Sequence, residues 1–193
     1  MTLRCFLALL LALPVLHASA AAPAEAEQRL HSGVDEAIRI AMGASSRSAL
    51  VERLRPLLEN RISFPVMTRR AVGPGWRQFS AAQQQKATQL FTTLIIRSYS
   101  NKFTIGEKME VKYLAPTNPA AGRVDVPTTL TYQGSRYAVT YRMEQEEGWK
   151  VTDVVIEGVS LVATYRSQLD AQFKKGGADA VVSSLSQSVS RPQ

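Results

Sequence analysis

Side chains that could carry out catalysis are scarce in this sequence. The only cysteine, Cys5, and one of the two histidines, His17, lie within the first twenty residues, so that His31 is the one histidine of the remaining chain. A histidine without a nucleophile to activate does not form a catalytic pair. A zinc site would need several carboxylates at ligand spacing, and a nucleotide site would need a glycine-rich phosphate loop; the sequence has neither pattern. We therefore expect no metal and no other cofactor.

Asp153 is the one remaining candidate for chemistry. It lies in an alternating segment, on the same predicted face as Trp149, Val151 and Val155. A carboxyl group on such an apolar face could be an acid or base with a raised pKa. It could equally form an ion pair or a cap that joins the strand to a helix, with Arg97 or Arg166 as a partner of suitable type. Both interpretations stay open at this point.

Residues 1–20 have the composition of a cleaved signal peptide. Arg4 precedes an apolar run over residues 5–16, and Ala18-Ser19-Ala20 is a cleavage site of the A-x-A type. The apolar run is shorter than the ~20 residues that span a bilayer. We expect an exported protein with one folded domain over residues 21–187 and a disordered tail over residues 188–193.

The positive charge is spread along the chain. The formal net charge is +7, and removing residues 1–20 takes away one arginine and no acidic residue, which leaves 22 − 16 = +6. Aromatic residues do not alternate with a basic stripe as they do in single-strand binders. We expect no nucleic-acid partner; a solvated basic surface and weak attraction to anionic lipid headgroups both fit.

The periodicity of apolar residues predicts helices, then strands, then helices. Helical spacing begins at Gln28 after a flexible start, and further helices are expected from Ser46 (bent or ended by Pro56), from Ser63 to Gly73, and from Ser80, which opens a capping box. Alternation then predicts strands over residues 109–113, 124–132, 137–143 and 149–156. A last helix runs from Ser160 to the glycines at 176 and 177, followed by a short helix. This order predicts an α+β fold in which helices pack on a curved four-stranded antiparallel sheet.

Both layers carry a surplus of inward-facing apolar residues. They pack as a dry core, or they enclose an apolar cavity between the curved sheet and the helices; periodicity does not distinguish the two. The residues concerned come from the helices after Ser80 and Ser160 and from three of the four strands: Leu90, Phe91, Leu94, Ile95, Leu161, Val162, Tyr165 and Leu169, and Val111, Tyr113, Tyr137, Val139, Tyr141, Val151 and Val155.

The segment GWKVTDVVIEGVSLVATYRSQL, residues 148–169, closely resembles the signature of the MlaC family of periplasmic phospholipid carriers, also called toluene-tolerance or auxiliary ABC-transport proteins. Further matches are Ser63-Phe64 with Met67, Ala71-Val72-Gly73 with Trp76, and Gln83, Phe91, Arg97 and Tyr99 on the long helix. The resemblance extends over roughly residues 30–185. The chain departs from the family pattern at Ser63, Pro74, Thr164 and Leu169, which bears on lipid specificity and not on the fold.

The resemblance implies a carrier without enzymatic activity. Such a protein shields the acyl chains of a phospholipid, or of a hopanoid as in one branch of the family, and passes the lipid between an outer-membrane lipoprotein complex and an inner-membrane ABC-type transporter, with transient contact to the membrane surface. We expect a periplasmic monomer. The wall of the cavity would be formed by Leu90, Phe91, Leu94, Ile95, Tyr99, Val111, Tyr113, Tyr137, Val139, Tyr141, Val151, Val155, Val159, Leu161, Val162 and Tyr165, and structural roles would fall to Trp76, Arg97, Trp149, Asp153 and Arg166.

Two other functions fit the residues. One is a small exported enzyme in which Asp153 acts as the acid or base in a cavity. The other is an adaptor that binds a membrane complex through its surface and holds no ligand. The carrier needs apolar walls and no catalytic group, which agrees best with the composition of the two layers.

Overall fold

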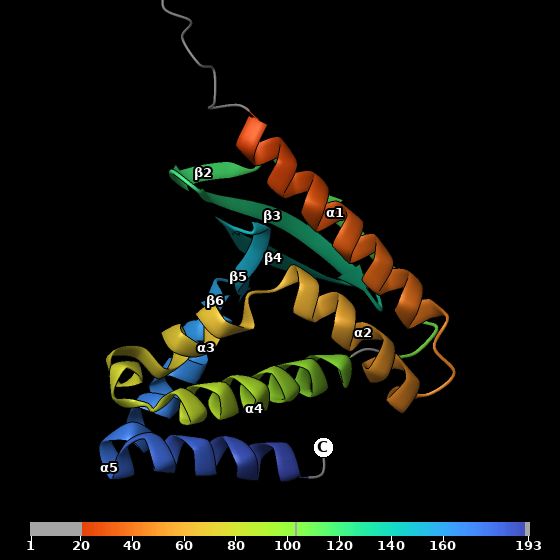
Figure 1. The fold of residues 1–193 in the computed structure, drawn as a ribbon. Helices are drawn as coiled ribbons and strands as arrows, with labels where there is room; N and C mark the ends of the chain where they lie inside the picture. The colour runs from red at the N-terminus through yellow and green to blue at the C-terminus, as the bar shows by residue number, and fades with distance from the viewer. Residues whose placement is uncertain (1–20, 103, 192–193) are drawn as a thin grey trace, which may run out of the picture.

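A computed structural model describes residues 21–102 and 104–191; the expected signal peptide lies outside the described residues. Figure 1 shows α1 crossing one face of a twisted sheet, with α4 and α5 lying together farther from it. The elements in chain order are α1 (Ala21–Met42), α2 (Arg47–Arg61), α3 (Phe64–Val72), the 3-10 helix η1 (Gly73–Gln78), α4 (Ala81–Ser100), β1 (Met109–Tyr113), β2 (Thr117–Ala120), β3 (Arg123–Tyr132), β4 (Ser135–Glu146), β5 (Gly148–Ile156), β6 (Val159–Ser160) and α5 (Leu161–Ser190). In the described part of the chain, every helix is too short or too polar to cross a membrane.

The predicted α+β fold is confirmed, and the sheet is larger than expected. The four predicted strands are β1, β3, β4 and β5, which pair antiparallel in the order β1-β3-β4-β5. Two short strands are added: β2 pairs with β3, and β6 pairs with β5. The turn before β6 consists of Glu157 and Gly158, with φ of 49° and 77°. Such a two-residue turn closes a tight hairpin, which brings the chain back alongside β5 immediately before α5 begins.

Serine side chains begin three of the helices, as their sequence patterns predict. Ser46 accepts a hydrogen bond from the backbone N–H of Ala49 at 3.1 Å, and Ser160 accepts one from Ala163 at 3.0 Å. Ser80 and Gln83 form the reciprocal bonds of a capping box. Ser63 precedes α3 as expected, but its hydroxyl donates to Glu146 at 3.1 Å and does not cap the helix.

Both ends of the described chain are more ordered than the sequence suggests. Residues 21–27 were expected to be flexible, yet they belong to α1, where Ala26 is fully buried against the sheet. The predicted break at Gly176 and Gly177 is present, but the chain then remains helical to Ser190. The expectation of a disordered tail is therefore wrong for residues 188–190. Apolar side chains at positions 181, 185 and 189 recur every four residues among serines and pack against the helical core.

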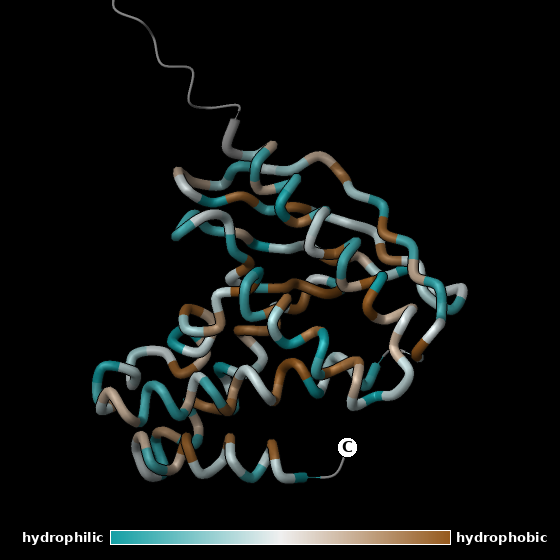
Figure 2. The backbone as a smooth tube through the Cα atoms, turned by 45° about the vertical axis from the view of Figure 1, so that its right-hand side comes forward, coloured by the Kyte–Doolittle hydropathy of each residue, from teal (hydrophilic) through white to brown (hydrophobic). Residues whose placement is uncertain are grey.

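The core consists of three hydrophobic clusters. The largest joins α3, η1, α4 and α5 and includes Phe91 and Leu94; the second packs the start of α1 on β3, β4 and β5; the third joins the end of α1 to α2. Figure 2 shows the hydrophobic segments of the sheet and the helices gathered toward the middle of the molecule. The helices thus have a core of their own, and they need not fill the space against the sheet.

Candidate functional site

An apolar cavity of about 290 Å³ lies between the concave side of the sheet and the helices. Its wall is drawn from all three clusters, with α1 and α2 on one side, α3 and α4 below, and β1, β3, β4 and β5 opposite. The apolar lining residues are Leu30, Val34, Ala37, Ile38 and Ala41; Leu50, Leu54, Leu57 and Leu58; Ile62, Phe64, Met67, Ile95, Ile96 and Leu161; and Met109, Val111, Leu130, Val139, Met143, Val151, Val154 and Ile156. Polar atoms enter the wall only at a few positions, mainly Arg29, Arg61, Tyr99, Ser100 and Tyr141.

The first two helices form a wall that the sequence analysis did not assign to the site. Helical spacing predicts both helices, but the residues of the expected wall all come from other elements. In the structure, α1 presents Leu30, Val34 and Ala41 to the cavity, and α2 presents Leu50 and Leu54. The signal available in the sequence was the spacing itself, since apolar residues recur at helical intervals in both helices.

On the sheet, alternation places one residue in two on the cavity side. Cross-strand pairs such as Val111 with Leu130 and Tyr141 with Val154 present both members to the cavity. The alternation of β5 is interrupted at Thr152, because Met143 pairs with Val151 while Arg142 pairs with Asp153. This bulge turns the second half of β5 over.

Because of this bulge, two predictions for β5 are wrong. Val154 and Ile156 line the cavity, whereas Val155, predicted to do so, does not. Asp153 is also moved off the face that carries Trp149 and Val151. Strict alternation from Trp149 cannot reveal this change, because the extra residue is fixed by pairing with β4 and not by residue type.

The predicted wall residues do not all line the cavity. Ile95, Tyr99, Val111, Val139, Tyr141, Val151 and Leu161 line the cavity. Phe91, Leu94 and Val162 are instead buried in the helical cluster, and Leu90 and Tyr165 pack against it. Tyr113 stacks on His31 with ring centroids 3.4 Å apart, while Tyr137 and Val159 are exposed. The long helix α4 has two apolar faces, and the prediction did not separate the one toward α5 from the one toward the sheet.

The two tyrosines of the cavity wall present neutral rings. Burial raises the pKa of Tyr141 to about 12. Burial is also the main cause that raises the pKa of Tyr99, followed by the charges of Tyr165 and Asp153. Both phenols therefore stay protonated at neutral pH, and their rings add apolar surface to the wall.

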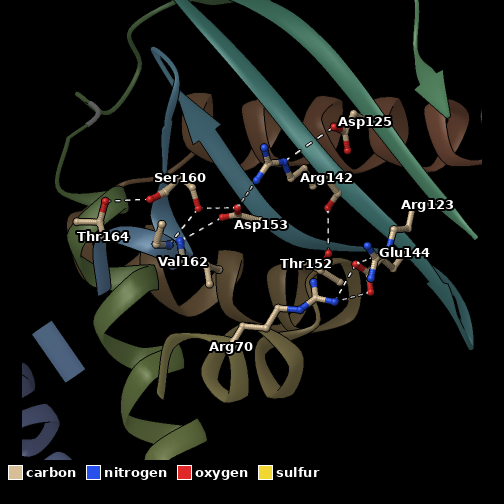
Figure 3. A network of polar contacts seen from close by, with 11 residues as sticks. Arg70, Arg123, Asp125, Arg142, Glu144, Thr152, Asp153, Ser160, Val162 and Thr164 are labelled. Atoms are coloured by element: carbon tan, nitrogen blue, oxygen red, sulfur yellow. Dashed lines mark hydrogen bonds and ion pairs between the residues drawn. The ribbon is translucent and has the colours of Figure 1, made fainter. Parts of the chain in front are cut away.

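Asp153 caps α5 and does not face the cavity. Its carboxylate accepts hydrogen bonds from the backbone N–H of Val162 at 3.1 Å, from the hydroxyl of Ser160 at 2.6 Å and from the guanidinium of Arg142 at 3.2 Å (Figure 3). The interpretation as a cap and ion pair is supported, but the partner is Arg142 and neither Arg97 nor Arg166.

The other predicted structural residues also serve as links between elements. Arg97 donates to the carbonyl oxygen of Val189 and so joins α4 to the end of α5. Arg166 reaches the carbonyl oxygen of Arg70 at 3.5 Å and lies against Gly73. Trp149 is buried among the residues that hold α1 on the sheet. The ring centroids of Trp76 and Phe79 are 5.2 Å apart, beside α5.

A neighbouring ion-pair network fixes α3 to the sheet. Arg70 donates to both carboxylate oxygens of Glu144 at 2.8 Å, and Arg123 lies 3.4 Å from the same group (Figure 3). Burial by itself would raise the pKa of Glu144, but the hydrogen bonds and charge of Arg70, together with Arg123, lower it. The network lies outside the cavity, and none of the described residues that line the cavity is a carboxylate, a histidine or a cysteine.

Comparison with known proteins agrees with this arrangement. A profile of the MlaC protein family matches residues 33–187. The fold is similar to the solved structure of a phospholipid-binding protein from Ralstonia solanacearum in complex with a phospholipid: the TM-score is 0.78 and the identity 28%, over 86% of this chain and 97% of that chain. No curated protein sequence gives a significant match. The family profile begins within α1 and extends into α5, so that it covers most of the residues that line the cavity, and the chain belongs to the MlaC family.

Proposed function

We propose that this protein is a periplasmic lipid carrier. It takes up a phospholipid with the acyl chains in the cavity, and it moves the lipid between an outer-membrane lipoprotein complex and an inner-membrane complex of the ABC-transporter type. The observation that carries the proposal is the cavity wall, which is apolar almost throughout and is built by a chain of the MlaC family. The phospholipid in complex with the Ralstonia solanacearum protein supports the choice of ligand class.

The physics of the task agrees with the composition of the wall. A lipid with two acyl chains would expose roughly 30 methylenes, and at ~0.8 kcal/mol each their exposure to water costs more than ~20 kcal/mol. A carrier has to replace the membrane interior by surface of the same kind, and it needs no reacting group. The leucine, isoleucine and valine side chains of α1, α2 and the sheet supply such surface.

The geometry of Asp153 argues against the alternative that this protein is an exported enzyme with Asp153 as its acid or base. Both oxygens of this carboxylate already accept hydrogen bonds from the start of α5 or from Arg142. A general acid or base must reach the proton that it transfers, whereas Asp153 is not part of the cavity wall. A binding protein therefore accounts for the cavity better than an enzyme does.

The proposal is tested by asking what the protein carries when it is made in a bacterial periplasm. We expect native mass spectra of the protein, purified without detergent, to show a stoichiometric adduct with the mass of a phospholipid that disappears after organic extraction. An adduct with the mass of a hopanoid would change the ligand class and keep the carrier. A bare polypeptide in every preparation would contradict lipid binding.

A further inference from the structure

Two arginines stand out in the apolar wall of the cavity. Arg29 belongs to the first half of α1, and Arg61 is the last residue of α2. Both are half-buried, and they are the charged residues of the wall. They meet where α1, the end of α2 and the start of β5 come together.

Arg29 is held in place by backbone and amide oxygens. Its Nε donates to the carbonyl oxygen of Trp149 at 2.9 Å, and its Nη2 donates to the side-chain oxygen of Asn60 at 3.1 Å. The guanidinium group is thereby oriented by neutral acceptors from β5 and α2, and its positive charge is not balanced by them.

Arg61 has fewer contacts. Its Nη1 donates to the carbonyl oxygen of Arg29 at 3.3 Å, while its buried Nε has no hydrogen-bond partner in the described part of the chain. The stem of Arg61 passes over Gly33 of α1, where a Cβ would lie 3.3 Å from Cγ of Arg61. The glycine thus leaves room for this guanidinium group against α1.

The charges of this pair lack a counter-ion. Among the residues that the structure describes, the ion pairs involve other groups, and neither Arg29 nor Arg61 approaches a carboxylate. Burial lowers the pKa of Arg29, and the positive charge of Arg61 lowers it further. Two unpaired, partly desolvated like charges are unfavourable unless an anion joins them. Their hydrogen bonds use fewer than half of the N–H groups that two guanidinium groups offer.

We propose that Arg29 and Arg61 bind the phosphate group of the carried lipid. The inference rests on the proposed function and deepens it, because it makes an anionic phosphate part of what the protein recognises. Guanidinium groups match phosphate oxygens with paired N–H donors, and such charge-assisted hydrogen bonds are the stronger ones. With the phosphate at the pair, the acyl chains would extend along the apolar wall from Leu30 and Val34 toward Leu50 and Leu54.

The test compares three ligands that carry acyl chains, a phosphate group or both. Dioctanoyl phosphatidylglycerol has acyl chains and a phosphate, dioctanoylglycerol has the chains alone, and sn-glycerol 3-phosphate has the phosphate alone. Each is titrated by calorimetry into the full exported chain, freed of lipid by extraction and refolded. We expect the protein to prefer the phospholipid over dioctanoylglycerol by about 10- to 100-fold.

Variants of Arg29 and Arg61 then test whether the preference for the phospholipid depends on these two side chains. Arg61→Gln should remove most of this preference, so that the affinities for the phospholipid and for dioctanoylglycerol become similar, and Arg29→Gln should act in the same direction. Arg39→Gln removes the same charge from an exposed position of α1 and should change neither affinity. Arg61→Lys keeps the charge without the planar fork and should lose part of the preference; it replaces Arg61→Gln if that variant does not fold.

The possible results separate the two proposals. Equal affinity of the unaltered protein for both lipids would overturn the phosphate site and leave the carrier standing. So would a preference for the phospholipid that is unchanged in the Arg61 variants. Binding of sn-glycerol 3-phosphate as tight as that of the phospholipid would show a site for free phosphate and would overturn the headgroup assignment. Binding of neither lipid would overturn the proposed function itself.

Discussion

Asp153 shows how one buried carboxylate can join two elements of the fold. It stands on β5 immediately after the bulge at Thr152, and it satisfies the free backbone N–H of Val162 at the start of α5. The positive end of the helix dipole favours a negative charge there. The carboxylate is 6% exposed and has Arg142 as its counter-charge. The polar contacts at this point account for the fixed direction in which α5 leaves the sheet.

Replacing this carboxylate should affect stability and not lipid binding. Asp153→Asn removes the charge that pairs with Arg142 and weakens the contacts with Ser160 and Val162. We expect a loss of about 1–3 kcal/mol in the free energy of unfolding, measured by urea denaturation. The folded variant should retain as much lipid as the unaltered protein. A variant with unaltered stability that had lost its function would instead point to a chemical role for Asp153.

At the scale of elements, the helical half is held together by close packing around η1. Gly75 is buried, and a Cβ built on it would lie 2.8 Å from three ring carbons of Phe173 on α5. The ring of Phe173 stacks on Phe79 with centroids 6.1 Å apart. The absence of a side chain at position 75 therefore sets how closely η1 approaches α5.

Gly75→Ala should overpack this contact. We expect a destabilisation of about 1–3 kcal/mol in urea denaturation, because the ring of Phe173 has to shift away from Phe79. In a Phe173→Leu background the same change should cost less, which a double-mutant cycle measures. An equal cost in both backgrounds would mean that contact with Phe173 is not the reason for glycine at this position.

Some helices and strands could be predicted from the sequence, and others could not. The helices that begin at Ser46, Ser80 and Ser160 and the four long strands were predictable, because capping residues and periodicity are local signals. A short helix after Gly177 was predicted, but its extension to Ser190 was not, since serines separate the apolar positions 181, 185 and 189. The second half of β5 was assigned to the wrong face because the bulge at Thr152 is a property of strand pairing.

At the scale of the whole molecule, the periodicity of apolar residues could not distinguish a dry core from a cavity. Apolar residues such as Phe91 and Val151 have the same periodicity whether they contact another side chain or line a hollow. The structure separates them: Phe91 belongs to the helical cluster, and Val151 lies on the cavity wall. The helices α3, α4 and α5 form their own core, so that they need not fill the space between themselves and the sheet.

The central claim is that lipid occupies this cavity, and filling the cavity tests it most directly. Ala37 lies on the wall contributed by α1, whereas Ala24 is exposed on the same helix. The measurement is the amount of extractable lipid phosphorus per protein after purification without detergent, for Ala37→Trp, Ala24→Trp and the unaltered protein. Circular dichroism confirms that each variant is folded.

We expect Ala24→Trp to carry the same amount of lipid as the unaltered protein. Ala37→Trp should carry about tenfold less, because accommodating acyl chains beside the new side chain would cost on the order of 1–3 kcal/mol of overpacking. A folded Ala37→Trp protein that retained lipid in the unaltered amount would show that the lipid is bound elsewhere and would contradict the account.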